Sequence, residues 1–166
     1  MKELTFLVGD DAAKDERWKS NFALNLVCDM WNFSNKIREG YVEEDKDKGV
    51  IRNTPVADAI RFKIVPTPNE IIEAARTRNY DLVVTDLNYG EGLERAGFWV
   101  VEAVKDILTP AQVLALYSSE SDPRIKKELV NCGARYVVSP MVMNSSDSKF
   151  KLLARTIVGH YEGSAR

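Results

Sequence analysis

Two acids end a short apolar run in FLVGDD, residues 6–11, and one aspartate ends another in DLVVTD, residues 81–86. Each run is rich in β-branched or aromatic residues, which is typical of a strand buried on both faces of a parallel sheet. In an open α/β sheet, ligands bind outside the carboxyl ends of the strands. We therefore expect Asp10, Asp11 and Asp86 to share one crevice.

Three carboxylates in one crevice repel each other unless a cation or a proton joins them. Mg²⁺ is the cation that best suits a small cluster of oxygen ligands. The residues alone therefore predict an acidic pocket that binds magnesium. Asp10 or Asp11 could also cap a following helix, since Asp is a favoured N-cap residue, and the two roles are compatible.

The rest of the chain alternates between strand-like and helix-like segments. We expect strands at residues 4–8, 60–65, 81–86, 111–117 and 136–138, and helices over residues 12–38, 67–76, 97–108, 122–132 and 147–160. An apolar stripe that begins at Trp18 predicts the first helix, and Thr67, with Glu70 three residues on, is the expected N-cap of the second. Phe98 and Trp99 of the third helix are expected in the core. Strict alternation implies a parallel sheet with helices on both faces. The predicted fold is a flavodoxin-like (βα)5 doubly wound sheet with strand order 2-1-3-4-5. Its switch point lies between strands one and three, which carry the acids.

Residues 39–58 interrupt this pattern as an insertion within a single domain of residues 1–166. Residues 43–49 mix acids and lysines without an apolar period, which predicts a solvated loop. The next strand, residues 60–65, alternates apolar and basic residues, so we expect it near a sheet edge. The helix over residues 12–38 is longer than a helix that covers one face of a sheet normally is. Phe33 and Ile37 near its end would then need other cover, and the insertion is the candidate.

The composition of the chain argues against several classes of function. The net charge of −2 provides no basic footprint for nucleic acid. No apolar stretch approaches the ~20 residues that span a bilayer. Cys28 and Cys132 lie in apolar helical contexts and are expected to be buried rather than to form a disulfide or metal pair, which favours a cytoplasmic protein. His160 is the only histidine and is expected to be a surface or packing residue, so histidine-based catalysis is unsupported.

These motifs resemble the receiver domains of bacterial two-component response regulators. FLVGDD resembles the first strand of the family, and DLVVTDL, residues 81–87, resembles its phosphoacceptor strand. GARYVVSP, residues 133–140, resembles the last strand and the loop after it, and residues 65–76 resemble the second strand and helix. The resemblance covers nearly the whole chain except about residues 39–58.

The resemblance implies a role for each matching residue. Asp86 would accept a phosphoryl group from a phosphohistidine. Mg²⁺ would be bound directly by Asp11, through water by Asp10, and by the backbone carbonyl of Asn88. A divalent cation offsets the repulsion between an attacking carboxylate and an anionic phosphoryl group. Tyr136 would be the aromatic switch residue, with packing at the sheet edge as its alternative.

Two positions depart from the family or are ambiguous. The hydroxyl that bonds the phosphoryl oxygen is Ser118 when counted back from Gly133, which we prefer, and Tyr117 when counted back from Ser139. Ser139 stands where the family has a lysine before the final proline, and the next lysine is Lys149. A hydroxyl forms a weaker bond to an anion than an ammonium does, so we expect phosphorylation to couple poorly to a conformational change.

The expected function is a receiver that takes phosphoryl from a sensor histidine kinase or a phosphotransfer protein. It would signal through contacts with a downstream protein, using helix four, strand five and helix five, a face that could also form a homodimer. The alternative is a pseudo-receiver, an interaction module that does not use phosphorylation, which Ser139 and the insertion favour. Resemblance to Mg²⁺-dependent phosphohydrolases would call for an Asp-x-Asp pair after strand one and a lysine late in the chain. This chain has adjacent aspartates and no such lysine, so we expect no enzyme. Direct contact with nucleic acid or membrane is not expected.

Overall fold

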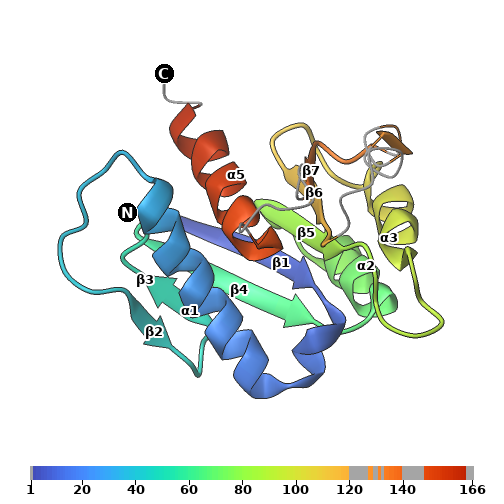
Figure 1. Cartoon of the computed structure of the whole chain (residues 1–166), viewed down its shortest axis with the longest axis horizontal. Coiled ribbons are helices and arrows are strands. Elements are labelled where there is room, and N and C mark those ends of the chain that lie inside the picture. Colours follow the sequence, from blue (N-terminus) through green and yellow to red (C-terminus); the bar gives the residue numbers. More distant parts are fainter. Residues whose placement is uncertain (1, 120–126, 129–130, 132, 140–147, 164–166) are drawn as a thin grey trace.

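The computed structural model of the chain describes residues 2–119, 127–128, 131, 133–139 and 148–163. These residues form one sheet with helices on both faces (Figure 1). The strands are β1 (Glu3–Gly9), β2 (Glu43–Asp45), β3 (Val50–Arg52), β4 (Ala59–Val65), β5 (Leu82–Asp86), β6 (Val113–Tyr117) and β7 (Tyr136–Val138). The helices are the 3-10 helix η1 (Asp11–Lys14), α1 (Glu16–Phe33), α2 (Pro68–Thr77), α3 (Ala96–Val104) and α5 (Lys149–Gly163). The fourth helix expected over residues 122–132 lies mostly outside the described residues.

The sheet within the described residues has seven strands in the order β2-β3-β4-β1-β5-β6-β7. The prediction of a (βα)5 unit with five strands in the order 2-1-3-4-5 is therefore corrected, because two antiparallel strands extend one edge. The five parallel strands run β4-β1-β5-β6-β7, with β1 between β4 and β5. This parallel part has the switch point of a flavodoxin-like fold between β1 and β5.

The two added strands come from the insertion. The prediction of a solvated loop is wrong, because β2 and β3 form a hairpin and β3 pairs antiparallel with β4. Val50 and Ile51 are buried, and Gly49, at φ +63°, makes the turn that precedes them. The strand β4 is accordingly an inner strand and not an edge. The acidic β2 now forms the edge, where charged side chains disfavour pairing with another strand.

The first helix is shorter than its apolar stripe predicted. It is broken at Asp15, whose carboxylate accepts a hydrogen bond from the backbone N–H of Arg17 at 2.9 Å and caps α1. The helix ends at Phe33, so Ile37 falls in the following loop and is 88% exposed. The insertion therefore does not cover Ile37. It contacts the end of α1 elsewhere, where the indole N–H of Trp31 donates to the carbonyl of Asn53 at 2.7 Å.

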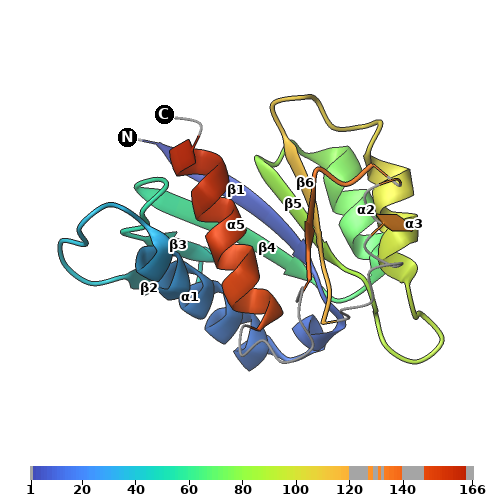
Figure 2. The ribbon, with the colours of Figure 1, turned by 45° about the horizontal axis from the view of Figure 1, so that its top comes forward.

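Alternation along the strands separates two cores. Leu4, Phe6 and Val8 of β1 point to the face covered by α1 and α5, whereas Leu7 and Val83 point to the face covered by α2 and α3. Figure 2 shows these two helix pairs on opposite sides of the sheet. Side chains two residues apart share a face. Asp86 therefore continues the row of Leu82 and Val84, which faces α1 and α5, and Tyr117 lies on the same face.

Three further expectations have mixed outcomes. The N-cap at α2 is confirmed, since the Thr67 hydroxyl accepts from the N–H of Glu70 at 3.2 Å and donates to the carboxylate of Glu70 at 2.8 Å. Trp99, expected in the core, is 50% exposed, because other residues of α3 face the sheet. Cys28 is half-buried with a free thiol, and Cys132 lies outside the described residues. Among the described helices, none has the length and apolar character needed to cross a membrane.

Candidate functional site

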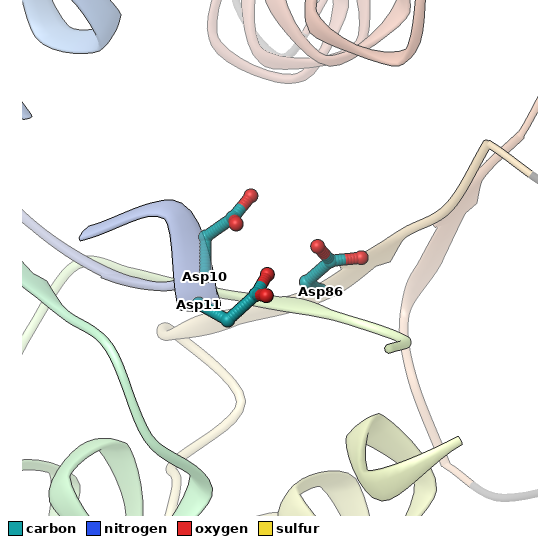
Figure 3. A group of neighbouring side chains, drawn as sticks. All are labelled: Asp10, Asp11 and Asp86. Carbon is teal, nitrogen blue, oxygen red and sulfur yellow. The ribbon is translucent and has the colours of Figure 1, made fainter. Parts of the chain in front are cut away.

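Three carboxylates meet at the carboxyl ends of β1 and β5 (Figure 3). Asp10, Asp11 and Asp86 each place one oxygen within 4.8 Å of the others. Asp10 and Asp86 are 3% and 4% exposed, and Asp11 is half-buried. The structure thus brings together the three acids that the sequence placed in one crevice.

Asp10 is held by several partners. Its backbone N–H donates to the carbonyl of Val65 at 3.1 Å, and its carboxylate accepts from the N–H of Ala12 at 3.0 Å, which caps η1. The hydroxyl of Tyr117 donates to the same carboxylate. Asp10 therefore combines a capping role with a place in the acidic cluster, while α1 itself is capped further along the chain.

Close packing leaves room only for glycine at two positions beside the cluster. A Cβ atom at Gly9 would lie 2.2 Å from the hydroxyl of Tyr89 and 2.7 Å from the side chain of Ile71. A Cβ atom at Gly97 would lie 2.3 Å from the carbonyl oxygen of Asp86, because α3 begins directly against the end of β5. Gly97 occupies the start of the third helix, as expected from the sequence.

The loop after Asp86 is closed by Asn88. The side-chain oxygen of Asn88 accepts from the backbone N–H of Arg95 at 2.8 Å, and Arg95 adopts a left-handed conformation with φ +60°. The N–H of Asn88 lies 3.4 Å from Asp86 Oδ1. The side chain of Asn88 therefore shapes this loop, and the metal-binding role assigned to its backbone carbonyl remains a prediction.

A basic residue that sequence reasoning did not assign completes the cluster. Lys149, the first residue of α5, places its Nζ 3.1 Å from Asp86 Oδ2 and 3.9 Å from Asp10 Oδ2. Its side chain is 16% exposed, and the ammonium lies 4.6 Å from the ring centroid of Tyr117. The sequence showed only that Lys149 is the first lysine after Ser139. Nothing in the spacing indicates that the start of α5 lies over the end of β5.

The charges in this site are not balanced. Burial raises the pKa of Asp86 from 3.8 to about 6, with Lys149 lowering it and Asp10 raising it. Burial, reinforced by the negative charges of Asp10 and Asp86, also raises the pKa of Tyr117, so that its hydroxyl stays protonated and donates. One ammonium against three carboxylates leaves an excess of negative charge, and a further cation or a proton would relieve it.

The remaining predicted residues lie beside the site. Ser118 is buried at the end of β6 and donates its backbone N–H to the carbonyl of Val138 at 2.9 Å. Ser139 is also buried, directly after β7. The hydroxyl of Tyr136 lies 3.0 Å from Nδ1 of His160 on α5, so both side chains take part in packing. The switch role of Tyr136 and the phosphoryl contact of Ser118 remain predictions.

Comparison with protein-family models and with curated proteins finds no match. Solved structures do match. A CheY-like receiver domain protein from Methanospirillum hungatei is 14% identical with a TM-score of 0.55, over 98% of this chain and 99% of that chain. A Burkholderia pseudomallei response regulator with a phosphorylated aspartic acid and a calcium ion is 15% identical with a TM-score of 0.56, over 98% of this chain and 71% of that chain. The phosphorylated cyanobacterial phytochrome response regulator RcpA is 14% identical with a TM-score of 0.56, over 99% and 98%. The chain therefore has the fold of response regulator receiver domains.

Proposed function

We propose that this protein is a signalling module that accepts a phosphoryl group on Asp86 from the phosphohistidine of a sensor histidine kinase or a phosphotransfer protein. The observation that supports it most is the cluster of three carboxylates at adjacent strand ends, with an ammonium 3.1 Å from Asp86. The shared fold adds weight, because a matching Burkholderia pseudomallei structure contains a phosphorylated aspartic acid and a calcium ion.

The donor set fits Mg²⁺. It consists only of carboxylate oxygens, which hard divalent cations prefer, and it carries more negative charge than Lys149 offsets. Asp10, Asp11 and Asp86, with the backbone carbonyl of Asn88, would hold the ion. When bound, Mg²⁺ would supply charge neutralisation between the carboxylate and the phosphoryl oxygens.

Asp86 and Tyr117 would have separate roles in the transfer. One oxygen of Asp86 forms a bond to phosphorus while the P–N bond of the donor breaks, and the leaving imidazole takes a proton. Asp86 attacks as the carboxylate, which its pKa of about 6 allows at neutral pH. The protonated hydroxyl of Tyr117 holds Asp10 in place. The result would be read by a downstream protein through a changed surface. The expected dimer face includes helix four, which lies mostly outside the described residues.

The pseudo-receiver is the second candidate, and one observation favours it. The Lys149 ammonium already contacts both Asp10 and Asp86, and such an internal cation could hold two of the acids together without a metal. In that case, the cluster would be structural and the protein would act through a surface that phosphorylation does not change.

Intact-mass measurement after incubation with acetyl phosphate separates the two candidates. We expect the wild type to gain one phosphoryl group in the presence of Mg²⁺ and not in excess EDTA. Asp86→Asn should gain none, whereas Asp106→Asn, which removes an exposed acid outside the cluster, should behave as the wild type. A wild type that gains no phosphoryl group under any condition would contradict the receiver proposal and support the pseudo-receiver.

A further inference from the structure

We propose, on the basis of the proposed phosphoryl transfer to Asp86, that Lys149 supplies the ammonium that contacts the phosphoryl group, and that it transmits phosphorylation to the groove between α1 and α5. The ammonium that is missing at Ser139 would thus come from a different element of the fold. The output would begin at the first turn of α5.

Lys149 is already placed for this contact. Its ammonium is largely buried and is paired with Asp86 at 3.1 Å and with Asp10 at 3.9 Å. The ring faces of Tyr117 and Phe150 flank the ammonium at 4.6 Å and 5.3 Å. A buried charge is stable only while it stays paired, so this ammonium must follow the negative charge of its partner.

Phosphorylation moves that negative charge. When Asp86 becomes an acyl phosphate, its carboxylate charge is replaced by charge on the phosphoryl oxygens, which lie further out from the end of β5. The ammonium of Lys149 therefore loses the closer of its two partners, keeps Asp10 nearby, and gains a stronger partner at a new position. Because Lys149 is the first residue of α5, this displacement acts on the first turn of that helix.

The next residue connects this turn to α1. Phe150 packs edge-on against Phe22 at 5.8 Å and Trp18 at 6.4 Å between ring centroids, and Trp18 stacks on Phe22 at 5.0 Å. A groove of about 330 Å³ lies between the two helices and is lined by residues that include Trp18, Phe22, Asn25, Ser148, Phe150 and Lys151. A shift of Lys149 therefore changes the wall of this groove through Phe150.

Tyr136 is attached to the same helix. Its hydroxyl lies 3.0 Å from Nδ1 of His160, about three turns after Lys149 along α5. A movement of Lys149 or of Tyr136 would therefore displace α5. The phosphoryl contact differs between them, because the side chain of Lys149 reaches Asp86 and that of Tyr136 contacts His160.

Two titrations followed by amide NMR test the role of Lys149 in the full chain. The first adds Mg²⁺ alone, and the second adds beryllofluoride in saturating Mg²⁺ as a phosphoryl mimic. The test variant is Lys149→Gln. The control is Arg155→Gln, which removes an exposed positive charge further along the same helix, outside the groove. Lys149→Met, which keeps an apolar chain over the two rings, serves if Lys149→Gln does not fold.

The two titrations should change in opposite directions. Without the ammonium, the acids should bind Mg²⁺ at least severalfold more tightly, because a competing positive charge is gone. Beryllofluoride should bind about tenfold to a hundredfold more weakly, because one hydrogen bond between charged groups is lost. The indole signal of Trp18 should shift on beryllofluoride binding in the wild type and in Arg155→Gln but not in Lys149→Gln. A merely structural role would weaken both ligands together.

The outcomes distinguish this inference from the function on which it rests. If the wild type binds beryllofluoride, Asp86→Asn does not, and Lys149→Gln matches the wild type, the receiver function stands and the role of Lys149 is overturned. Weakening of both ligands in Lys149→Gln overturns it as well. If the wild type binds no beryllofluoride at any Mg²⁺ concentration, the proposed function falls and this inference falls with it.

Discussion

Replacing Asp86 by asparagine should stabilise the metal-free protein at neutral pH. Asp86 is almost fully buried beside Asp10, and burial raises its pKa from 3.8 to about 6. The ionised carboxylate is therefore less favourable in the folded protein than in the unfolded chain. Asparagine keeps the size and polarity of the side chain and removes the cost of ionisation.

The sign and size follow from the linkage between protonation and folding. Because the folded pKa is the higher one, the folded state holds its proton more tightly. The resulting stability is fully present below pH 3.8 and is lost as the pH rises through about 6. A shift of about two pKa units corresponds to roughly 3 kcal/mol, at 1.36 kcal/mol per unit. Between about pH 4 and pH 7.5, the free energy of unfolding of the wild type should fall relative to that of Asp86→Asn by about 2–3 kcal/mol.

Urea unfolding in excess EDTA at several pH values measures this difference. Subtracting the variant curve from the wild-type curve removes the contributions of all other titrating groups. Asp106→Asn, which removes an exposed acid outside the cluster, is the control for the loss of one surface charge. If Asp86→Asn runs parallel to the wild type, then Lys149 neutralises Asp86 completely and the electrostatic case for a second cation in this site fails.

Two other predictions concern the hairpin and the single histidine. Ile51→Ala should lower the free energy of unfolding by about 2–5 kcal/mol, because Ile51 is 1% exposed, whereas Ile37→Ala in the exposed loop should change it by less than about 0.5 kcal/mol. Equal, small effects in urea unfolding would show that the hairpin does not belong to the core. Burial, with a smaller contribution from Arg135, lowers the pKa of His160 below 6.5, so protonation should cost stability as the pH falls. An NMR titration of the ring protons should have its midpoint below 6.5, and Arg135→Gln should raise that midpoint; a wild-type midpoint above 6.5 would refute the assignment.

Local rules predicted the acidic cluster well. Asp10, Asp11 and Asp86 each follow a short apolar run, and parallel strands bring their carboxyl ends to one edge of the sheet. The N-cap at Thr67 was equally predictable, since Thr67 and its partner Glu70 lie within one helical turn. These features depend on neighbours in the chain or on a topology that the alternation of elements already implies.

The same local sequence patterns did not predict the hairpin of the insertion. Each of its strands has three residues, too few to show a period of two, and the acids and lysines around them are typical of a loop. The break before α1 was missed because the apolar stripe begins only at Trp18 and does not indicate where the helix starts. In both cases, pairing with β4 or capping by one side chain decided the structure, and neither leaves a periodic signal.

The order and composition of the segments were enough to predict which strands carry acids, that these strands are neighbours, and therefore that negative charge gathers at their ends. Which basic side chain of the protein contacts those acids depends on how distant elements pack against each other. Ser139 holds the position beside the last strand, but it is Lys149 whose ammonium reaches Asp86. The physical reason is that strand-end acids are brought together by hydrogen-bonded register, which follows from the order of the elements. The contact of Lys149 depends instead on how α5 lies across the sheet, and that is decided by the packing of Phe150 and the rest of the helix on α1.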